Sequence, residues 1–323
     1  MQGRHIVMLR TSMSKFRWLP ASALAAVASL LPVATLAAGD WLIISFPGNT
    51  PEWNGKLGVS ELRVPCTNAP ASCMKRLRTL EQDEGVARFT VSMTREMGEV
   101  AKYAAQFSEL SKADGRLRGI GIDDFVGTLQ DWRKADPKGA VRALQQALAN
   151  AKSANPSLEF GITLYEDQLQ SPLLGEQAFP RTLRAQVDRV SLFVHYRENG
   201  PAYRDYVRQV RRLFPKADIV AGAYAYDRMD YLPCAKGGTK PCTAAQEADL
   251  FERTFDVQVA MLGKGEVDGI EFFPGRFGVE QDWSSWTKNP RNCKRDRLQD
   301  CLAMTRRMRE RALSILREAR PDG

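Results

Sequence analysis

The sequence predicts a single (β/α)8 barrel, in which eight parallel strands close into a ring and each is followed by a helix or a long connection. Eight short runs carry the period-2 or apolar pattern of strands, and helical patterns separate most of them. Such alternation implies a parallel sheet, and eight units in one series imply closure. An open doubly wound sheet is the alternative, but no glycine-rich phosphate loop follows the first run.

The expected strands are rich in β-branched and aromatic residues and end at turn or polar residues. They cover 41–46, 59–64, 87–93, 119–123, 158–165, 187–196, 218–226 and 267–273. Helices are expected over 71–82, after Thr94 as its cap, around 141–148, around 206–213, after a capping box at Thr243, and over 296–316. Trp132 is placed in a polar loop.

Residues 1–38 have the layout of a secretory signal peptide. Four cations without an acid precede an apolar run over 19–36, which ends in Ala37-Ala38. An uncleaved transmembrane anchor is the alternative, but Pro20 and Pro32 favour cleavage. No second run of this length follows, so the mature protein is expected to be exported, periplasmic or secreted, without stable membrane insertion. Residues 39–323 form the predicted catalytic barrel.

The six cysteines form three close pairs in the predicted mature part, which favours disulfides in an exported protein. Pairing by proximity gives Cys66–Cys73, Cys234–Cys242 and Cys293–Cys301. Metal binding is the competing interpretation, but the cysteine spacings do not match it and His195 is the only histidine after the leader. We therefore expect neither a metal nor a cofactor.

The net charge of the predicted mature chain is too small to indicate an anionic partner. The formal net charge is +8 for the whole sequence, and removing the four leader cations lowers it to about +4. No basic stripe interleaved with aromatic residues is present, so nucleic-acid binding is not expected. The expected partner is a polysaccharide or oligosaccharide substrate, and the expected state is a monomer.

Acidic residues at the ends of several predicted strands indicate where catalysis would occur, because active sites of such barrels lie at the strands' C-terminal ends. Asp123 ends the run 119–123 and shares a face with its glycines, and Asp124 follows it. Paired carboxylates are the groups that hydrolyse glycosidic bonds. Glu166, on the next strand, is the preferred partner of Asp123 by adjacency. Glu271 is the rival partner, because strand parity points it inward.

Aromatic and polar residues at the same strand ends and in the following loops could bind sugar rings, which stack on flat aromatic faces. Each aromatic taken alone is more typical of ordinary packing, and His195 could bind substrate or act as a base. The candidates for substrate binding are Trp53, Tyr165, His195, Tyr196, Tyr224, Tyr226, Asp227, Trp283 and Trp286.

Two short segments, Gly119–Phe125 and Leu164–Glu166, resemble secreted barrel glycosidases of microbial polysaccharides, of the spherulin-4-like and endo-α-1,4-polygalactosaminidase-like type. The resemblance implies hydrolysis of an exopolysaccharide, with Asp123 or Asp124 and Glu166 as the pair. Chitinase-like barrels are a second comparison, but Gly121 and Phe125 stand where their motif has an aspartate and the catalytic glutamate.

Two other functions remain open from the sequence. The barrel could bind carbohydrate without cleaving it, within an export or assembly complex. It could also hydrolyse another bond in cell-wall material.

Overall fold

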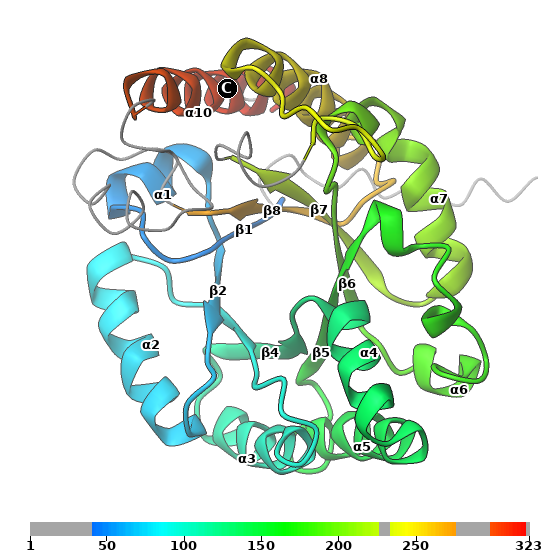
Figure 1. The fold of residues 1–323 in the computed structure, drawn as a ribbon. Coiled ribbons are helices and arrows are strands. Elements are labelled where there is room, and N and C mark those ends of the chain that lie inside the picture. Colours follow the sequence, from blue (N-terminus) through cyan, green and yellow to red (C-terminus); the bar gives the residue numbers. More distant parts are fainter. Residues whose placement is uncertain (1–40, 226–232, 276–297, 321–323) are drawn as a thin grey trace, which may run out of the picture. The chain divides into compact units, whose positions relative to one another are not determined.

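Eight parallel strands close into a barrel in the computed structural model, which describes residues 41–225, 233–275 and 298–320 (Figure 1). Each strand pairs with the next along the chain, and β8 pairs back onto β1. The strands are β1 (Leu42–Ser45), β2 (Glu61–Pro65), β3 (Phe89–Ser92), β4 (Leu117–Ile122), β5 (Glu159–Tyr165), β6 (Arg189–Phe193), β7 (Asp218–Tyr224) and β8 (Gly269–Phe273). The predicted (β/α)8 barrel is confirmed.

Helices surround the sheet on its outer side (Figure 1). The α-helices are α1 (Pro51–Leu57), α2 (Pro70–Glu84), α3 (Val100–Ala113), α4 (Phe125–Ala135), α5 (Pro137–Ala151), α6 (Arg181–Arg184), α7 (Tyr203–Leu213), α8 (Ala244–Leu262) and α10 (Leu298–Ala319). Three 3-10 turns complete the described elements: η1 (Glu166–Gln168), η2 (Pro172–Leu174) and η3 (Arg197–Ala202). The predicted leader, residues 1–38, lies outside the described residues.

Two local predictions about helices were wrong. Trp132 lies in α4 rather than in a loop, and its side chain is buried. The polar residues around it, such as Asp131 and Lys134, form the solvated face of an amphipathic helix. Thr94 does not cap α3, because that helix begins at Val100; its hydroxyl instead accepts from the amide of Glu96.

The predicted capping box at Thr243 is confirmed at the start of α8. The Thr243 hydroxyl accepts from the Gln246 amide at 3.3 Å, and the Gln246 side chain accepts from the Thr243 amide at 2.9 Å. These two bonds satisfy main-chain donors that the first helical turn leaves unpaired.

The side chains of β4 divide between the two sides of the barrel wall as strand alternation requires. Ile120 and Ile122 are fully buried in the apolar core that the barrel shares with the helices. Gly121 faces the interior, where β4 runs close to β5, and a Cβ at this position would lie 2.5 Å from the carbonyl oxygen of Gly161. A larger residue there would push the two strands apart.

Ion pairs, rather than only apolar side chains, fill the barrel below its mouth. Arg63 contacts Glu271 at 3.0 Å, and their side chains are 3% and 0% exposed. Nearer the N-terminal ends of the strands, Arg189 contacts Glu61 and Glu159. Burial alone would lower the pKa of Arg189, but the two carboxylates raise it above its usual value, so this guanidinium stays charged.

Two disulfides link the pairs Cys66–Cys73 and Cys234–Cys242, two of the three pairs predicted from proximity. The first joins the end of β2 to α2, and the second closes the loop before α8. The third pair, Cys293–Cys301, lies outside the residues whose side chains are described.

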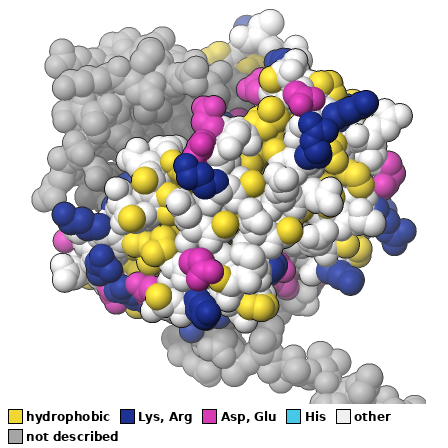
Figure 2. Space-filling view, turned by 90° about the horizontal axis from the view of Figure 1, so that it is seen from below, with side chains coloured by type: hydrophobic (Ala, Val, Ile, Leu, Met, Phe, Trp, Pro, Cys, Tyr) yellow, Lys and Arg dark blue, Asp and Glu magenta, His cyan; other side chains and the backbone are white. Residues whose placement is uncertain are grey.

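Charges of both signs are interspersed on the face over α3 and α5, with no broad area of one sign (Figure 2). Ion pairs such as Lys102–Glu99 and Arg116–Glu81 account for part of this mixture.

Within the described parts of the chain, no helix combines the length and the apolar character that a membrane crossing needs.

Candidate active site at the barrel mouth

A pocket with an empty volume of about 270 Å³ opens at the C-terminal ends of the strands. Side chains from six strand ends line it: Phe46, Asp123, Thr163, Tyr165, Phe193, Tyr224 and Phe273. Asp123 is the only acid among these lining residues, and it faces inward as the alternation along β4 predicts. The pocket therefore presents one carboxylate to an otherwise largely aromatic cavity.

Asp123 and Asp124 share a single cation. Arg95, which follows β3, lies 3.4 Å from the Asp123 carboxylate and 3.2 Å from that of Asp124. Asp123 also accepts from the Asp124 amide at 3.0 Å. Both carboxylates are about one third exposed, at 34% and 35%, so the guanidinium offsets their mutual repulsion at the edge of the solvent.

Asp124 has a left-handed backbone, with φ at 47°, at the N-cap position of α4. Among the described residues it is the only non-glycine residue with positive φ. This conformation costs of order 1–3 kcal/mol and is concentrated at functional sites. Here it turns the chain sharply from β4 into α4, which lets Asp123 face the pocket while Asp124 points toward Arg95.

Glu166 does not line that pocket. Its side chain is buried, and its two oxygens accept from three N–H donors of the segment after β6. The amides of His195 and Tyr196 donate at 2.6 Å and 3.0 Å, and the side chain of Asn199 donates at 3.0 Å. Glu166 thus holds the β6 segment against the end of β5, where the paired sheet stops at Tyr165 and Phe193.

Replacing Glu166 with glutamine tests whether this carboxylate holds the loop. We expect E166Q to destabilise the fold by about 1–3 kcal/mol, because an amide NH2 would replace one acceptor oxygen and face a buried N–H donor. Chemical denaturation measures the change, and E198Q, an exposed site on the same loop, is the matched control. Unchanged stability of E166Q with lost activity would instead support the predicted catalytic role of Glu166.

Glu271 has the inward direction that strand parity predicts, but it lies deeper than the mouth. Besides Arg63, it accepts from the hydroxyl of Ser191, and Arg63 in turn donates to the hydroxyl of Ser92 at 3.0 Å. The carboxylate is fully buried and does not line the pocket with Asp123. Its described contacts are those of an interior ion-pair network.

Among the predicted substrate-binding residues, the structure brings Tyr165 and Tyr224 to the pocket. Three phenylalanines at the same level were not predicted: Phe46, Phe193 and Phe273. Their positions in the sequence could have indicated them. Phe193 and Phe273 are the last, inward-facing residues of β6 and β8, and Phe46 directly follows β1. Tyr224 packs against Phe193 and Phe273, with ring centroids 4.7 Å and 5.7 Å apart.

Trp53 contacts cations rather than this pocket. The Arg309 guanidinium of α10 lies 4.1 Å from its ring centroid, and the Lys56 ammonium lies 4.7 Å away. Its ring therefore helps to pack α1 against α10, which lie side by side in Figure 1. Four other predicted residues, Tyr226, Asp227, Trp283 and Trp286, lie outside the described residues, and Tyr196 is not among the residues that line the pocket.

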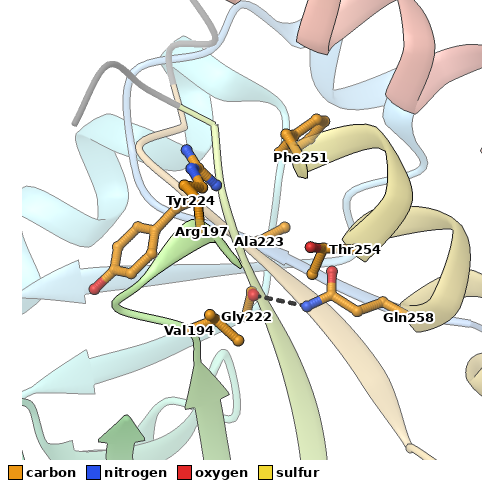
Figure 3. A pocket seen from close by; sticks show the side chains of 8 residues that line it. All are labelled: Val194, Arg197, Gly222, Ala223, Tyr224, Phe251, Thr254 and Gln258. Atoms are coloured by element: carbon orange, nitrogen blue, oxygen red, sulfur yellow. Dashed lines mark hydrogen bonds between the residues drawn. The ribbon is translucent and has the colours of Figure 1, made fainter. Parts of the chain in front are cut away.

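Behind Tyr224, a second pocket lies between β7 and α8 (Figure 3). The Gln258 side chain donates to the Gly222 carbonyl at 2.9 Å, while the ring of Tyr224 points away from it. Arg197, at the start of η3, is buried and pairs with Glu247 of α8. These contacts anchor the segment after β6 to the helix layer.

His195 lies at the mouth beside Tyr165, with the two rings stacked at a centroid distance of 3.6 Å and an angle of 15°. Its Nδ1 is 3.1 Å from Asp167 of η1. Burial would raise the pKa of Asp167, but the hydrogen bond and charge of His195, with the charge of Lys236, lower it below its usual value. Asp167 is thus ionised at neutral pH.

Ligand atoms of Glu166, Asp167 and His195 lie within 4.8 Å of one another, a spacing that a metal ion could bridge. The oxygens of Glu166, however, already accept from main-chain and side-chain N–H groups. A cation at Glu166 would face those hydrogens. The arrangement fits a hydrogen-bonded Asp167–His195 pair better than a metal centre.

No protein-family model matches the chain, and no curated protein matches it. Solved structures do share the fold. One is a glucosidase from Croceicoccus marinus, with 13% identity and a TM-score of 0.50, covering 84% of this chain and 69% of that chain. Another is the exo-β-1,4-mannosidase Op5Man5 from Opitutaceae bacterium strain TAV5, with 11% identity and a TM-score of 0.50, covering 85% and 60%.

These likenesses show the barrel fold, which these two enzymes share, and at such identities they show the fold alone. The resemblance to the spherulin-4-like group stays a prediction.

Proposed function

We propose that this chain is an exported glycoside hydrolase that cleaves a polysaccharide in the pocket at the barrel mouth, with Asp123 acting on the substrate. The observation that carries the proposal is the position of Asp123, the one acid lining an otherwise largely aromatic pocket at the catalytic end of the barrel. Aromatic rings such as Tyr165 and Tyr224 can pack against the CH faces of a sugar. The carboxylate can then act on the bond that they position.

The surroundings of Asp123 suit a base or a nucleophile. Arg95 lies 3.4 Å from its carboxylate, and either role requires that carboxylate in its ionised form. Asp124 shares the guanidinium and so helps to hold Arg95 at the mouth. In this proposal Glu166 and Glu271 support the site through their contacts with the β6 segment and with Arg63, and do not touch the substrate.

Export is the second part of the proposal. Its support is the signal-peptide pattern of residues 1–38 and the two disulfides, which persist in oxidising compartments. The proposed catalytic steps use side chains and water, with no metal ion.

A carbohydrate-binding barrel without catalysis is the second candidate function, and a specific observation favours it. Arginines contact three of the four acids predicted to be catalytic: Arg95 contacts Asp123 and Asp124, and Arg63 contacts Glu271. Charge-paired acids can also serve as fixed acceptors for sugar hydroxyls.

A screen of the purified protein against microbial exopolysaccharides separates the two candidates. Release of new reducing ends reports hydrolysis, and retardation of the protein in polysaccharide-containing gels reports binding. We expect both signals with one polymer. Binding without release would support the carbohydrate-binding barrel, and neither signal with any polymer would contradict the proposed function.

A further inference from the structure

Resting on the proposed function, the geometry points to His195, oriented by Asp167, as the proton donor to the glycosidic oxygen, working together with Asp123 from two strands away. A second ionisable group is required, because Asp123 is the only acid that lines the pocket among the described residues. Glycoside hydrolysis needs one group to protonate the leaving oxygen and another to activate water or attack the sugar.

The main chain fixes the position of His195. Its amide donates to the buried carboxylate of Glu166 at 2.6 Å, as does that of Tyr196 at 3.0 Å. Two residues later, the buried Arg197 pairs with Glu247 of α8. The segment is therefore held on both sides of His195, by β5 and by the helix layer. A catalytic side chain keeps its geometry only when contacts of this kind hold the chain around it.

Two contacts fix the imidazole ring itself. Tyr165, which lines the pocket, covers one ring face at 3.6 Å, and Asp167 lies 3.1 Å from Nδ1. An ionised carboxylate can only accept a hydrogen bond, so Nδ1 carries the proton in this contact. Nε2 is then the nitrogen that can give or take a proton, and it has no hydrogen-bond partner among the described residues. The His195 side chain remains 23% exposed.

The spacing of the strands suits hydrolysis by direct attack of water. Asp123 follows β4 and His195 follows β6, with β5 between them. Two strand intervals of about 4.8 Å place the strand ends on the order of 10 Å apart along the sheet, and less across the curved barrel. Inverting glycosidases separate their two groups by roughly 6.5–9.5 Å, which leaves room for the water.

The proposed step balances without a further reactant. Protonated His195 gives the proton on Nε2 to the glycosidic oxygen, while the bond from that oxygen to the anomeric carbon breaks and its electron pair stays on the oxygen. Water forms the new bond to the anomeric carbon, and Asp123 takes the proton that the water loses. Exchange with solvent after product release restores protonated His195 and ionised Asp123.

Histidine NMR tests the arrangement directly, because the chain has two histidines and H5Q leaves His195 as the only one. In the full chain carrying H5Q, we expect the neutral ring to be the tautomer with the proton on Nδ1. D167A, which removes the acceptor, should abolish this preference. A neutral ring protonated on Nε2, or an unchanged tautomer in D167A, would overturn the assignment. A shift of the imidazole signals at stoichiometric Zn²⁺ would instead mark a metal site and also overturn it.

Kinetics test the catalytic role on the polymer that the wild type cleaves. We expect H195Q to lower kcat on this polymer by about 10²- to 10⁴-fold, the usual contribution of a general acid. On the glycosyl fluoride of the same sugar, whose leaving group needs no proton, H195Q should stay within about tenfold of the wild type, an effect that a loss of structure would not produce. D131N, at an exposed aspartate of α4, is the control that should leave both rates unchanged.

The outcomes separate this inference from the proposed function. If the wild type hydrolyses the polymer and H195Q hydrolyses it equally fast, only the role of His195 is overturned. Equal losses of H195Q activity on the polymer and on the glycosyl fluoride would also overturn that role alone. A wild type that cleaves no polymer would overturn the proposed function and this inference together.

Discussion

The D123N variant is expected to cleave polysaccharide about 10²- to 10⁴-fold more slowly than the wild type, while it still binds the polymer. Asparagine has nearly the same shape and can still accept from the Asp124 amide, so the turn into α4 should persist. What it loses is the negative charge that a base or a nucleophile requires. Reducing-end release measures the rate, and gel retardation by the same polymer measures binding.

The stability of D123N should change little. The contact with Arg95 is partly exposed, and such ion pairs contribute about 0–1 kcal/mol. D131N removes a charge from an exposed aspartate of α4 and should keep full activity. A D123N variant that hydrolyses the polymer within a fewfold of the wild type would remove Asp123 from the mechanism.

The buried pair of Arg63 and Glu271 should dominate the stability of the barrel interior. We expect E271Q to cost about 3–5 kcal/mol, because it leaves the Arg63 guanidinium buried without its charge partner. The hydroxyls of Ser92 and Ser191, which accept hydrogen bonds from Arg63, cannot neutralise that charge. Urea denaturation of the wild type and E271Q measures the difference.

A double-mutant cycle with R63M provides the control for this prediction. The variant R63M/E271Q removes both charges, so we expect it to be less destabilised than the sum of the two single variants. Additive costs would show that the two charges do not depend on each other. A stable but inactive E271Q would instead support the predicted catalytic role of Glu271.

The barrel could be predicted from the sequence because its signals are local. Alternation within runs such as 119–123 and the eightfold series of units are properties of the chain itself. The error at Trp132 has a physical reason: charged residues on the solvated side of α4 resemble a loop when only their polarity is considered. The capping box at Thr243 was predictable because both of its partners lie within three residues.

The candidate site was predictable only in part, because burial and partners depend on distant segments. Parity placed Asp123 at the mouth and pointed Glu271 inward, but it could not show that Arg63, on the far side of the sequence, would pair with Glu271. Adjacency favoured Glu166, yet its oxygens are taken by amides of the segment after β6. The phenylalanines of the pocket could not be predicted, because apolar strand residues usually belong to the core.

Hydrolysis in water enriched in heavy oxygen, followed by mass spectrometry of the products, tests the central claim most directly. If Asp123 promotes attack of water on the anomeric carbon, each new reducing end formed by the wild type should carry one heavy oxygen atom, and D123N should form almost none. Products that lack the label and contain an unsaturated sugar, or polymer that stays intact while bound, would contradict glycoside hydrolysis at this pocket.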